Sequence, residues 1–317
     1  MNSYIYICLF LAIIFYANAF ENKTIGEFCE KRFQKPTLLR KAGLEDYLKT
    51  NSENGILEKE FNSIPSEQLF AADQSEKPEN KPKNRYQNIL AYDHSRVALN
   101  RSKSDSDYIN ANFLDAVDAP DRYIVTQTPM ENTVKDFWEM VWENNIYQIV
   151  TISKIKQFGK ERLFKYWPED ASRYGKVEVT LDQSDYLSDY VIRKFTISYD
   201  DKHRVVTQYH FITWDDNQLP NPETFLAFVN EVRASREYIR QNPRRPLLVH
   251  CSTGSGPSAT FVLINSATEA LKKVFKVDFS RELCSMRMKR MQVVDSYSQF
   301  VFAIRVVVTS TKKMKTN

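Results

Sequence analysis

The stretch His250-Cys251-Ser252-Thr253-Gly254-Ser255-Gly256-Pro257-Ser258 decides the fold of this chain. The apolar run before it, residues 247–249, is typical of a buried strand, and a helix is predicted to begin near Ser258. Two of the chain's seven glycines, Gly254 and Gly256, lie in the loop, where the backbone must turn tightly. A strand, a cysteine loop and a helix in this order form a cradle whose amides and helix dipole favour an anion. Taken alone, the loop is also compatible with an ordinary strand-to-helix turn.

The overall composition is that of a folded, enzyme-sized protein. The chain has 317 residues, of which 42% are hydrophobic and 26% charged, enough for one large core or two modest ones. Its 44 Lys and Arg residues against 40 Asp and Glu give a net charge of only +4. One local cluster of basic residues lies in the tail, residues 311–317. This balance gives no indication of nucleic-acid binding.

Residues 1–19 have the pattern of a secretory signal peptide. The first 16 residues carry no charged side chain, and a small-x-small cleavage pattern, Ala17-Asn18-Ala19, follows the apolar core. We therefore expect a secreted protein. An uncleaved anchor and a buried amino-terminal helix remain as alternatives, because the usual positive residue before the apolar segment is absent. The segment is short for a bilayer crossing, so no stable membrane span is expected after cleavage.

The cysteines do not suggest a disulfide framework. Cleavage of the signal peptide would leave Cys29, Cys251 and Cys284, an odd and sparse set, so we expect a fold that does not depend on oxidation. A free nucleophilic thiol normally suits a reducing compartment, which is at odds with secretion. Two glycosylation sequons, Asn22-Lys23-Thr24 and Asn100-Arg101-Ser102, would fit a secreted chain.

The order of apolar patterns predicts an α/β protein. Residues 20–55 are expected to form a helical extension, and residues 56–310 a single domain in which β-branched runs alternate with helical segments. Strands are expected at 123–126, 146–152, 177–180 and 205–213, and helices at 134–143, 223–240, 258–273 and 296–308. The polar stretch 73–83 has the composition of a linker but is too short to mark a domain boundary.

From residue 56 to residue 308 the chain resembles the protein-tyrosine phosphatase family. The resemblance rests on several motifs in the family's order and at similar spacing: Lys83-Asn84-Arg85-Tyr86, residues 107–112, Gln127-Thr128-Pro129, Phe137-Trp138, Tyr166-Trp167-Pro168, residues 214–220, and the His250 loop. It implies an α/β fold with a twisted mixed β-sheet flanked by helices. Because His94, His203 and His210 lack metal-ligand spacing, we expect neither a metal nor an organic cofactor. The chain also resembles the degenerate single-domain phosphatases of polydnaviruses and parasitoid venoms, which implies a host-directed effector.

The resemblance assigns roles to residues of this chain. Cys251 would be the nucleophile that attacks phosphorus, and Asp216 the acid that protonates the leaving phenolate. Tyr86 would form the wall of a slot for a phosphotyrosine ring, and Asn88 would contact the substrate backbone. The residues expected to surround the phosphate are Ser252, Thr253, Gly254, Ser255, Gly256 and Ser258.

Pro257 is the main departure from the family pattern, because the family has an arginine there that grips the phosphate. Two charge-assisted hydrogen bonds are worth roughly 3–6 kcal/mol, so their loss predicts a rate penalty on the order of a thousandfold. Counting without gaps from Tyr166 places Gln157 where the family has the glutamate that pairs with this arginine. Proline is well suited to the start of a helix, so the change would remove chemistry without disturbing the fold.

Four further positions depart from the family. Asp295 stands where the family has the glutamine that positions the hydrolytic water, and its carboxylate would repel a phosphate dianion. Gln292 fills a usually small position at the substrate entrance. Asp215 and Gln218 replace a proline and a glycine in the acid loop, which is expected to disturb loop closure.

The sequence therefore leads us to expect a phosphatase-like pseudoenzyme that acts by binding a protein partner and hydrolyses phosphotyrosine very poorly or not at all. One alternative is a weakly active phosphatase, since Cys251 and Asp216 remain and Arg162 would supply positive charge. The other is a phosphotyrosine-binding decoy that uses the Tyr86 slot and captures phosphorylated partners without turning them over.

Overall fold

Nine strands form one mixed sheet in the order β1-β2-β3-β11-β4-β10-β9-β8-β7, and a two-stranded sheet pairs β5 with β6. The computed structural model describes residues 29, 37–102, 105–116, 119–154, 156–157, 160–161, 164–215, 218–239 and 245–313. The strands are β1 Arg96–Ala98, β2 Tyr108–Ala116, β3 Ala119–Gln127, β4 Gln148–Ile152, β5 Lys156–Gln157, β6 Lys160–Glu161, β7 Ala171–Tyr174, β8 Val177–Tyr186, β9 Tyr190–Tyr199, β10 Lys202–Phe211 and β11 Leu247–Cys251.

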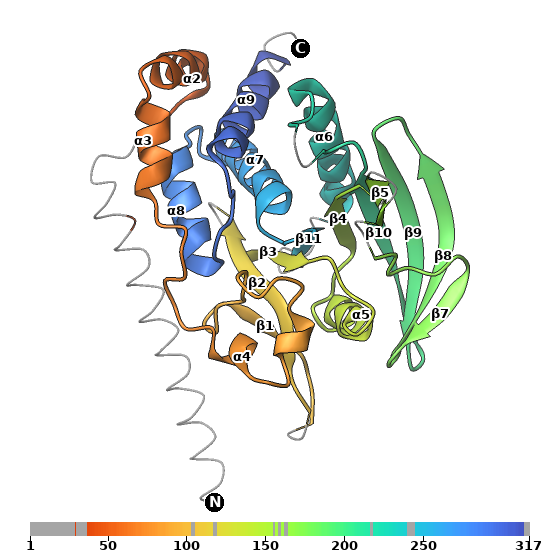
Figure 1. Ribbon diagram of the computed structural model, residues 1–317. Coiled ribbons are helices and arrows are strands. Elements are labelled where there is room, and N and C mark those ends of the chain that lie inside the picture. The colour runs from red at the N-terminus through yellow and green to blue at the C-terminus, as the bar shows by residue number, and fades with distance from the viewer. Residues whose placement is uncertain are drawn as a thin grey trace, which may run out of the picture.

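Helices cover both faces of the large sheet (Figure 1). The α-helices are α2 Leu44–Glu53, α3 Ile56–Ser63, α4 Asp73–Glu76, α5 Val134–Glu143, α6 Pro222–Ile239, α7 Gly256–Lys273, α8 Phe279–Lys289 and α9 Tyr297–Lys313, and the short 3-10 helices are η1 Lys41–Gly43 and η2 Lys81–Lys83. Figure 1 shows α3, α6, α7, α8 and α9 on one side of the sheet and α5 on the other. No helix within the described part of the chain is both long and apolar enough to cross a bilayer.

The predicted strand before the cysteine loop is the centre of the sheet. β11 runs parallel to β3 on one side and to β4 on the other, with Leu248 opposite Ile124 and Ile149. Leu247 and Val249 pack into the core beneath α6 to α9, whereas Leu248 points into the core beneath α5. Because both faces of this strand are buried, its sequence is continuously apolar. The geometry places Cys251 at its carboxyl end.

The predicted α/β class and the predicted mixed sheet flanked by helices are confirmed. The expected helix at 134–143 coincides with α5, while α7 begins two residues before the expected Ser258, and α9 extends past 308 to Lys313. The linker-like stretch 73–83 instead forms α4 and η2 and buries Ser75 and Asn80. Its polar side chains form hydrogen bonds within the domain, such as the one from the Ser75 hydroxyl to the Ala91 carbonyl.

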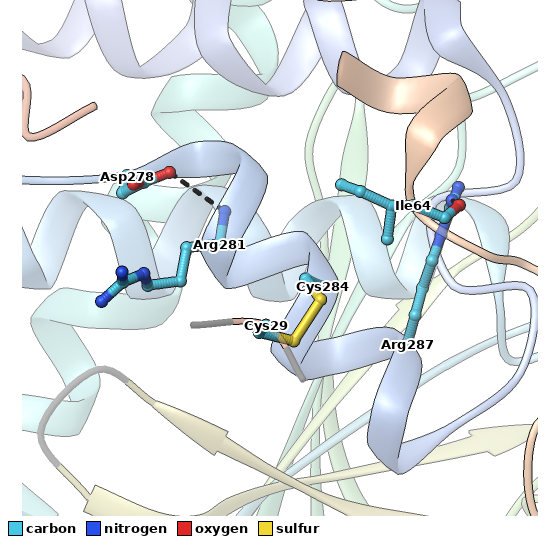
Figure 2. Close-up of a disulfide and its surroundings, with 6 residues drawn as sticks. All are labelled: Cys29, Ile64, Asp278, Arg281, Cys284 and Arg287. Atoms are coloured by element: carbon cyan, nitrogen blue, oxygen red, sulfur yellow. Dashed lines mark hydrogen bonds between the residues drawn. A yellow bond between two sulfur atoms is a disulfide. The ribbon is translucent and has the colours of Figure 1, made fainter. Parts of the chain in front are cut away.

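The structure contains a disulfide that the cysteine pattern did not predict, whereas the expectation that the fold does not depend on oxidation stays a prediction. Cys29 and Cys284 form a disulfide across 255 residues of sequence, and Figure 2 shows it joining the amino-terminal side of the chain to α8. An odd number of cysteines rules out complete pairing but not a single pair. Two partners so far apart in sequence give no local spacing signal. Cys251 is the free, buried cysteine among the described residues.

A second connection near the disulfide is made by Arg287 of α8 (Figure 2). Its Nη1 donates to the carbonyl of Ile64 at 2.5 Å, beyond the end of α3. Its Nε and Nη2 donate to the carbonyls of Val293 and Val294 at 3.2 and 3.0 Å. The guanidinium therefore holds the amino-terminal helices and the loop before Asp295 in a fixed relation.

The central strands also enclose a polar network around His250. The Nε2 of His250 lies 2.8 Å from the Tyr166 hydroxyl and 2.9 Å from the Thr151 hydroxyl, and its Nδ1 lies 3.3 Å from the Thr128 hydroxyl. Burial, assisted by the nearby His210 and Arg85, lowers the pKa of His250 to about 3. The imidazole next to Cys251 is therefore neutral at physiological pH.

Removal of the disulfide should lower the stability of the fold. We expect the double variant Cys29→Ser/Cys284→Ser to lose about 2–5 kcal/mol of unfolding free energy, because the cross-link restricts the unfolded chain. Urea titration of the oxidised protein and the variant measures this. Cys251→Ser, which leaves the disulfide intact, is the control. Equal midpoints for wild type and double variant would show that the cross-link contributes nothing.

Burial of His250 should make the fold sensitive to acid. The folded-state pKa of about 3 lies below the ordinary histidine pKa of 6.5, so the stability is fully present above pH 6.5 and is lost as the pH falls. Between pH 6.5 and about 5 this histidine should cost about 1.5 kcal/mol, and His250→Gln should remove that slope. Urea titrations at both pH values measure it, with the exposed His203→Gln as control. Parallel pH curves for wild type and His250→Gln would contradict the prediction.

Candidate active site

The loop after β11 places the Cys251 thiol at the bottom of a cleft. Cys251 is buried, and its Sγ lies 3.2 Å from the Ser258 hydroxyl and 3.7 Å from the Thr253 hydroxyl. The loop leads directly into α7, with Ser255 at the N-cap position. The thiol therefore faces two hydroxyl groups and the positive end of a long helix.

Two glycines allow this loop to pack as closely as it does. Gly254 has a φ of +70°, and a Cβ there would lie 2.4 to 2.6 Å from backbone atoms of Thr126 and Gln127. At Gly256 a Cβ would lie 2.5 Å from the Asp295 carboxylate. The first position requires glycine for both conformation and space, and the second leaves room for Asp295 beside the start of α7.

Arg290 binds the backbone of the cysteine loop, and the sequence analysis did not identify this residue. Its Nε donates to the Gly254 carbonyl at 2.7 Å and its Nη2 to the Thr253 carbonyl at 3.3 Å. The same guanidinium donates to the side-chain oxygens of Asn112 and Asn110 on β2, at 2.7 and 2.8 Å. Full burial lowers the pKa of Arg290 to about 10, so it remains charged at neutral pH. In the printed sequence it is one basic residue among several, with no signal of its burial.

The cleft above Cys251 has a volume of about 450 Å³. Its lining includes Tyr86, Trp214, Cys251, Pro257, Asp295 and Gln299, and none of the described lining residues is a lysine, arginine or histidine. Tyr86 stands against the loop, with its hydroxyl 3.0 Å from that of Ser252. The structure therefore brings together Tyr86, the cysteine loop, Pro257 and Asp295, which sequence analysis had placed in one site.

Pro257 and Asp295 give this cleft its electrostatic character. Pro257 is the second residue of α7, as expected for a proline that suits a helix start. Partial burial raises the pKa of the Asp295 carboxyl above its ordinary value, while Gln299 opposes that shift through a hydrogen bond. Arg290 does not replace the missing arginine, because its donors are bound to the loop carbonyls and to β2. Among its described lining residues the cleft thus has a carboxylate and no cation.

A hydrogen bond spans the rim of the cleft. Gln292 Nε2 donates to the Asn88 carbonyl at 3.1 Å, which links two positions expected at the substrate entrance. Gln292 and Val294 have φ values of +56° and +50°, so the loop carrying them adopts a conformation that side chains rarely favour. A substrate backbone approaching Asn88 would meet the Gln292 side chain.

The structure describes the acid loop, residues 214–220, except for residues 216 and 217. Asp215 and Gln218 form an isolated antiparallel bridge, and Lys154 Nζ lies 2.7 Å from the Asp215 carboxylate. This ion pair fixes the carboxylate that stands in place of the expected proline. Asp216 lies outside the described residues, as does the side chain of Gln157, whose backbone belongs to β5.

The chain is similar in sequence to known proteins. Residues 80–309 match the protein-tyrosine phosphatase family model. Human receptor-type tyrosine-protein phosphatase alpha is 36% identical over 79% of the chain, and chicken receptor-type tyrosine-protein phosphatase eta is 34% identical over 94%. The matched part covers 32% and 22% of those relatives, so the chain spans less than a third of their length. The match, the mixed sheet and the cysteine loop at its centre show that this chain belongs to the protein-tyrosine phosphatase family.

Proposed function

We propose that this chain is a secreted phosphatase-family pseudoenzyme that binds a protein partner and hydrolyses phosphotyrosine very poorly or not at all. The observation that carries the proposal is the charge of the cleft. A phosphotyrosine dianion next to Cys251 would meet the Asp295 carboxylate and no lysine, arginine or histidine among the described lining residues. Like charges at short range disfavour binding.

The size of the missing contribution supports the same conclusion. An arginine at position 257 would supply two charge-assisted hydrogen bonds, worth roughly 3–6 kcal/mol in the transition state. Even the lower figure corresponds to a rate loss of over a hundredfold. The backbone amides and the dipole of α7 remain, but Pro257 itself has no amide hydrogen. The partner is then bound through surface contacts that do not depend on phosphate.

A weakly active phosphatase is the second candidate, and the thiol's surroundings favour it. Cys251 Sγ has the Ser258 hydroxyl at 3.2 Å, and the Tyr86 wall stands in place. These groups would support slow attack on a bound phosphate. A phosphotyrosine decoy would use the same slot without turnover, and would bind a phosphorylated peptide more tightly than its unphosphorylated form.

A phosphatase assay with matched variants tests the proposal. Wild type should release no more phosphate from a phosphotyrosine peptide than Cys251→Ser, because the wild type lacks a functional phosphate grip and the variant lacks the nucleophile. Pro257→Arg should raise the rate, and Pro257→Arg/Asp295→Gln should raise it further, by about tenfold or more, because the repelling carboxylate is gone. Wild-type turnover that disappears in Cys251→Ser would overturn the pseudoenzyme proposal in favour of the weak enzyme.

Secretion is supported by two independent observations. The amino-terminal pattern is that of a signal peptide, and disulfides such as Cys29–Cys284 persist mainly in oxidising compartments. The sequon at Asn100 offers a direct test, because Asn100 and Ser102 are both exposed in the segment after β1. Asn100 is therefore accessible on the folded surface.

Expression in eukaryotic cells should produce a secreted chain with a glycan at Asn100. Treatment with peptide N-glycosidase should lower the apparent mass, and Asn100→Gln and Ser102→Ala should each abolish the part of this shift that depends on Asn100. Ser102→Thr preserves the sequon and should keep the shift, which separates loss of the acceptor from damage to the fold. Retention of the chain inside the cell with its leader uncleaved would contradict the secretion proposal.

A further inference from the structure

The end of α7 and the loop that follows it carry an unusual surface, Lys272-Lys273-Val274-Phe275-Lys276. All five residues are exposed, and the side chains of Val274 and Phe275 are 48% and 65% accessible to solvent. Phe275 also has a φ of +60°, a conformation that costs energy for a bulky side chain. An exposed aromatic ring therefore lies between lysines, on a backbone of unfavourable conformation.

The amino-terminal segment adds to the same surface. The backbones of Leu39 and Val277 form an antiparallel bridge, with N–H to carbonyl distances of 2.8 and 3.0 Å in the two directions. This pairing brings Leu38, 51% exposed, and the exposed Arg40 next to the loop. The basic tip is defined here as Leu38, Arg40 and residues 272–276. It presents three apolar side chains within a ring of four cations.

Positive charges outnumber negative ones in the two segments that form the tip, because residues 37–41 and 272–278 contain five lysine or arginine residues and one acidic residue, Asp278. Asp278 accepts the backbone N–H groups of Thr37 and Arg281, which fixes it at the start of α8. Glu45 lies 2.5 Å from Lys312 at the end of α9, so it is paired with another cation. Figure 1 shows α2 and the end of α9 at the same end of the molecule. That end therefore keeps a positive bias around its apolar side chains.

The basic tip lies far from the cysteine loop. α7 begins at Gly256 beside that loop and ends at Lys273 after 18 residues, which at about 1.5 Å per residue spans about 27 Å. Lysines in the last turn of a helix ordinarily offset the helix dipole, and this accounts for Lys272 and Lys273. It does not account for the exposed Val274 and Phe275, or for Lys276 and Arg40.

We propose that the basic tip docks this protein onto an anionic lipid surface. Protruding apolar side chains enter the boundary between headgroups and acyl chains, while a surrounding ring of lysine and arginine attracts anionic headgroups. Val274 and Phe275 project from the loop as exposed side chains, which suits insertion into a bilayer. Membrane binding through this end would leave the cleft around Cys251 facing away from the lipid.

A second exposed tip in the same chain provides the control. Tyr186 and Leu187, between β8 and β9, are 75% and 43% exposed, so Tyr186 is even more accessible than Phe275. This tip is flanked by Asp185 and Asp189 in place of lysines. An aromatic ring with acidic neighbours should be repelled by anionic headgroups. Comparison of the two tips therefore tests the combination of charge and apolar surface, and not exposure alone.

The experiment is co-sedimentation of the full mature chain with vesicles of phosphatidylcholine, alone or mixed with phosphatidylserine. We expect binding to the mixed vesicles only, and weaker binding as salt rises from about 0.1 M to about 1 M, where charges are screened. Phe275→Ala should weaken binding about tenfold or more, in line with the burial of one large apolar side chain. Lys272→Glu/Lys273→Glu/Lys276→Glu should abolish binding, and Tyr186→Ala should leave it unchanged.

Three results would overturn the proposal. The first is absence of binding to phosphatidylserine vesicles by wild type whose circular dichroism and melting temperature show it to be folded. The second is equal loss of binding in Tyr186→Ala and Phe275→Ala, since the tip would then have no special role. The third is tight binding to heparin or polyglutamate, unaffected by Phe275→Ala, with no vesicle binding. That result would make the tip a site for a soluble acidic polymer.

Discussion

The buried guanidinium of Arg290 is the interaction on which the site depends. It binds the carbonyls of Gly254 and Thr253 on one side and the asparagine side chains of β2 on the other. The carbonyls of Gly254 and Thr253 need such a partner because they lie against the buried Arg290, inside the protein. Buried carbonyls without donors would each cost about 1–3 kcal/mol. One charged side chain satisfies two of them and ties the loop to the sheet.

This anchor explains how the fold can lose its catalytic arginine and still keep the shape of the site. An arginine at position 257 would act on the ligand, whereas Arg290 acts on the loop. Replacement by proline removes the first interaction and leaves the second intact, and proline is tolerated in the first turn of α7. The shape of the loop therefore depends on Arg290, whereas contact with the ligand depends on position 257. A cleft of ordinary form around Cys251 is no indication of activity.

The sequence predicts the parts of the fold that have a local signal. The apolar run at 247–249 and the glycines of the loop give the central strand and its turn, and the helices α5, α6, α7 and α9 follow from their periodicity. Arg290 and the disulfide could not be found in this way. Their significance comes from partners brought together only by folding: β2 for Arg290, and Cys29 for Cys284, 255 residues away. Phe275 gave no signal because an exposed aromatic residue in a loop has no periodic pattern.

The disulfide also changes how the free cysteine should be understood. A thiol in an oxidising compartment is at risk mainly as the thiolate, which is the form that attacks disulfides and reacts with oxidants. Cys251 lies at the bottom of the cleft, so a reagent would have to approach its sulfur through that opening. Burial further restricts access to the sulfur. The burial of the Cys251 thiol therefore makes a free cysteine more compatible with the proposed secretion.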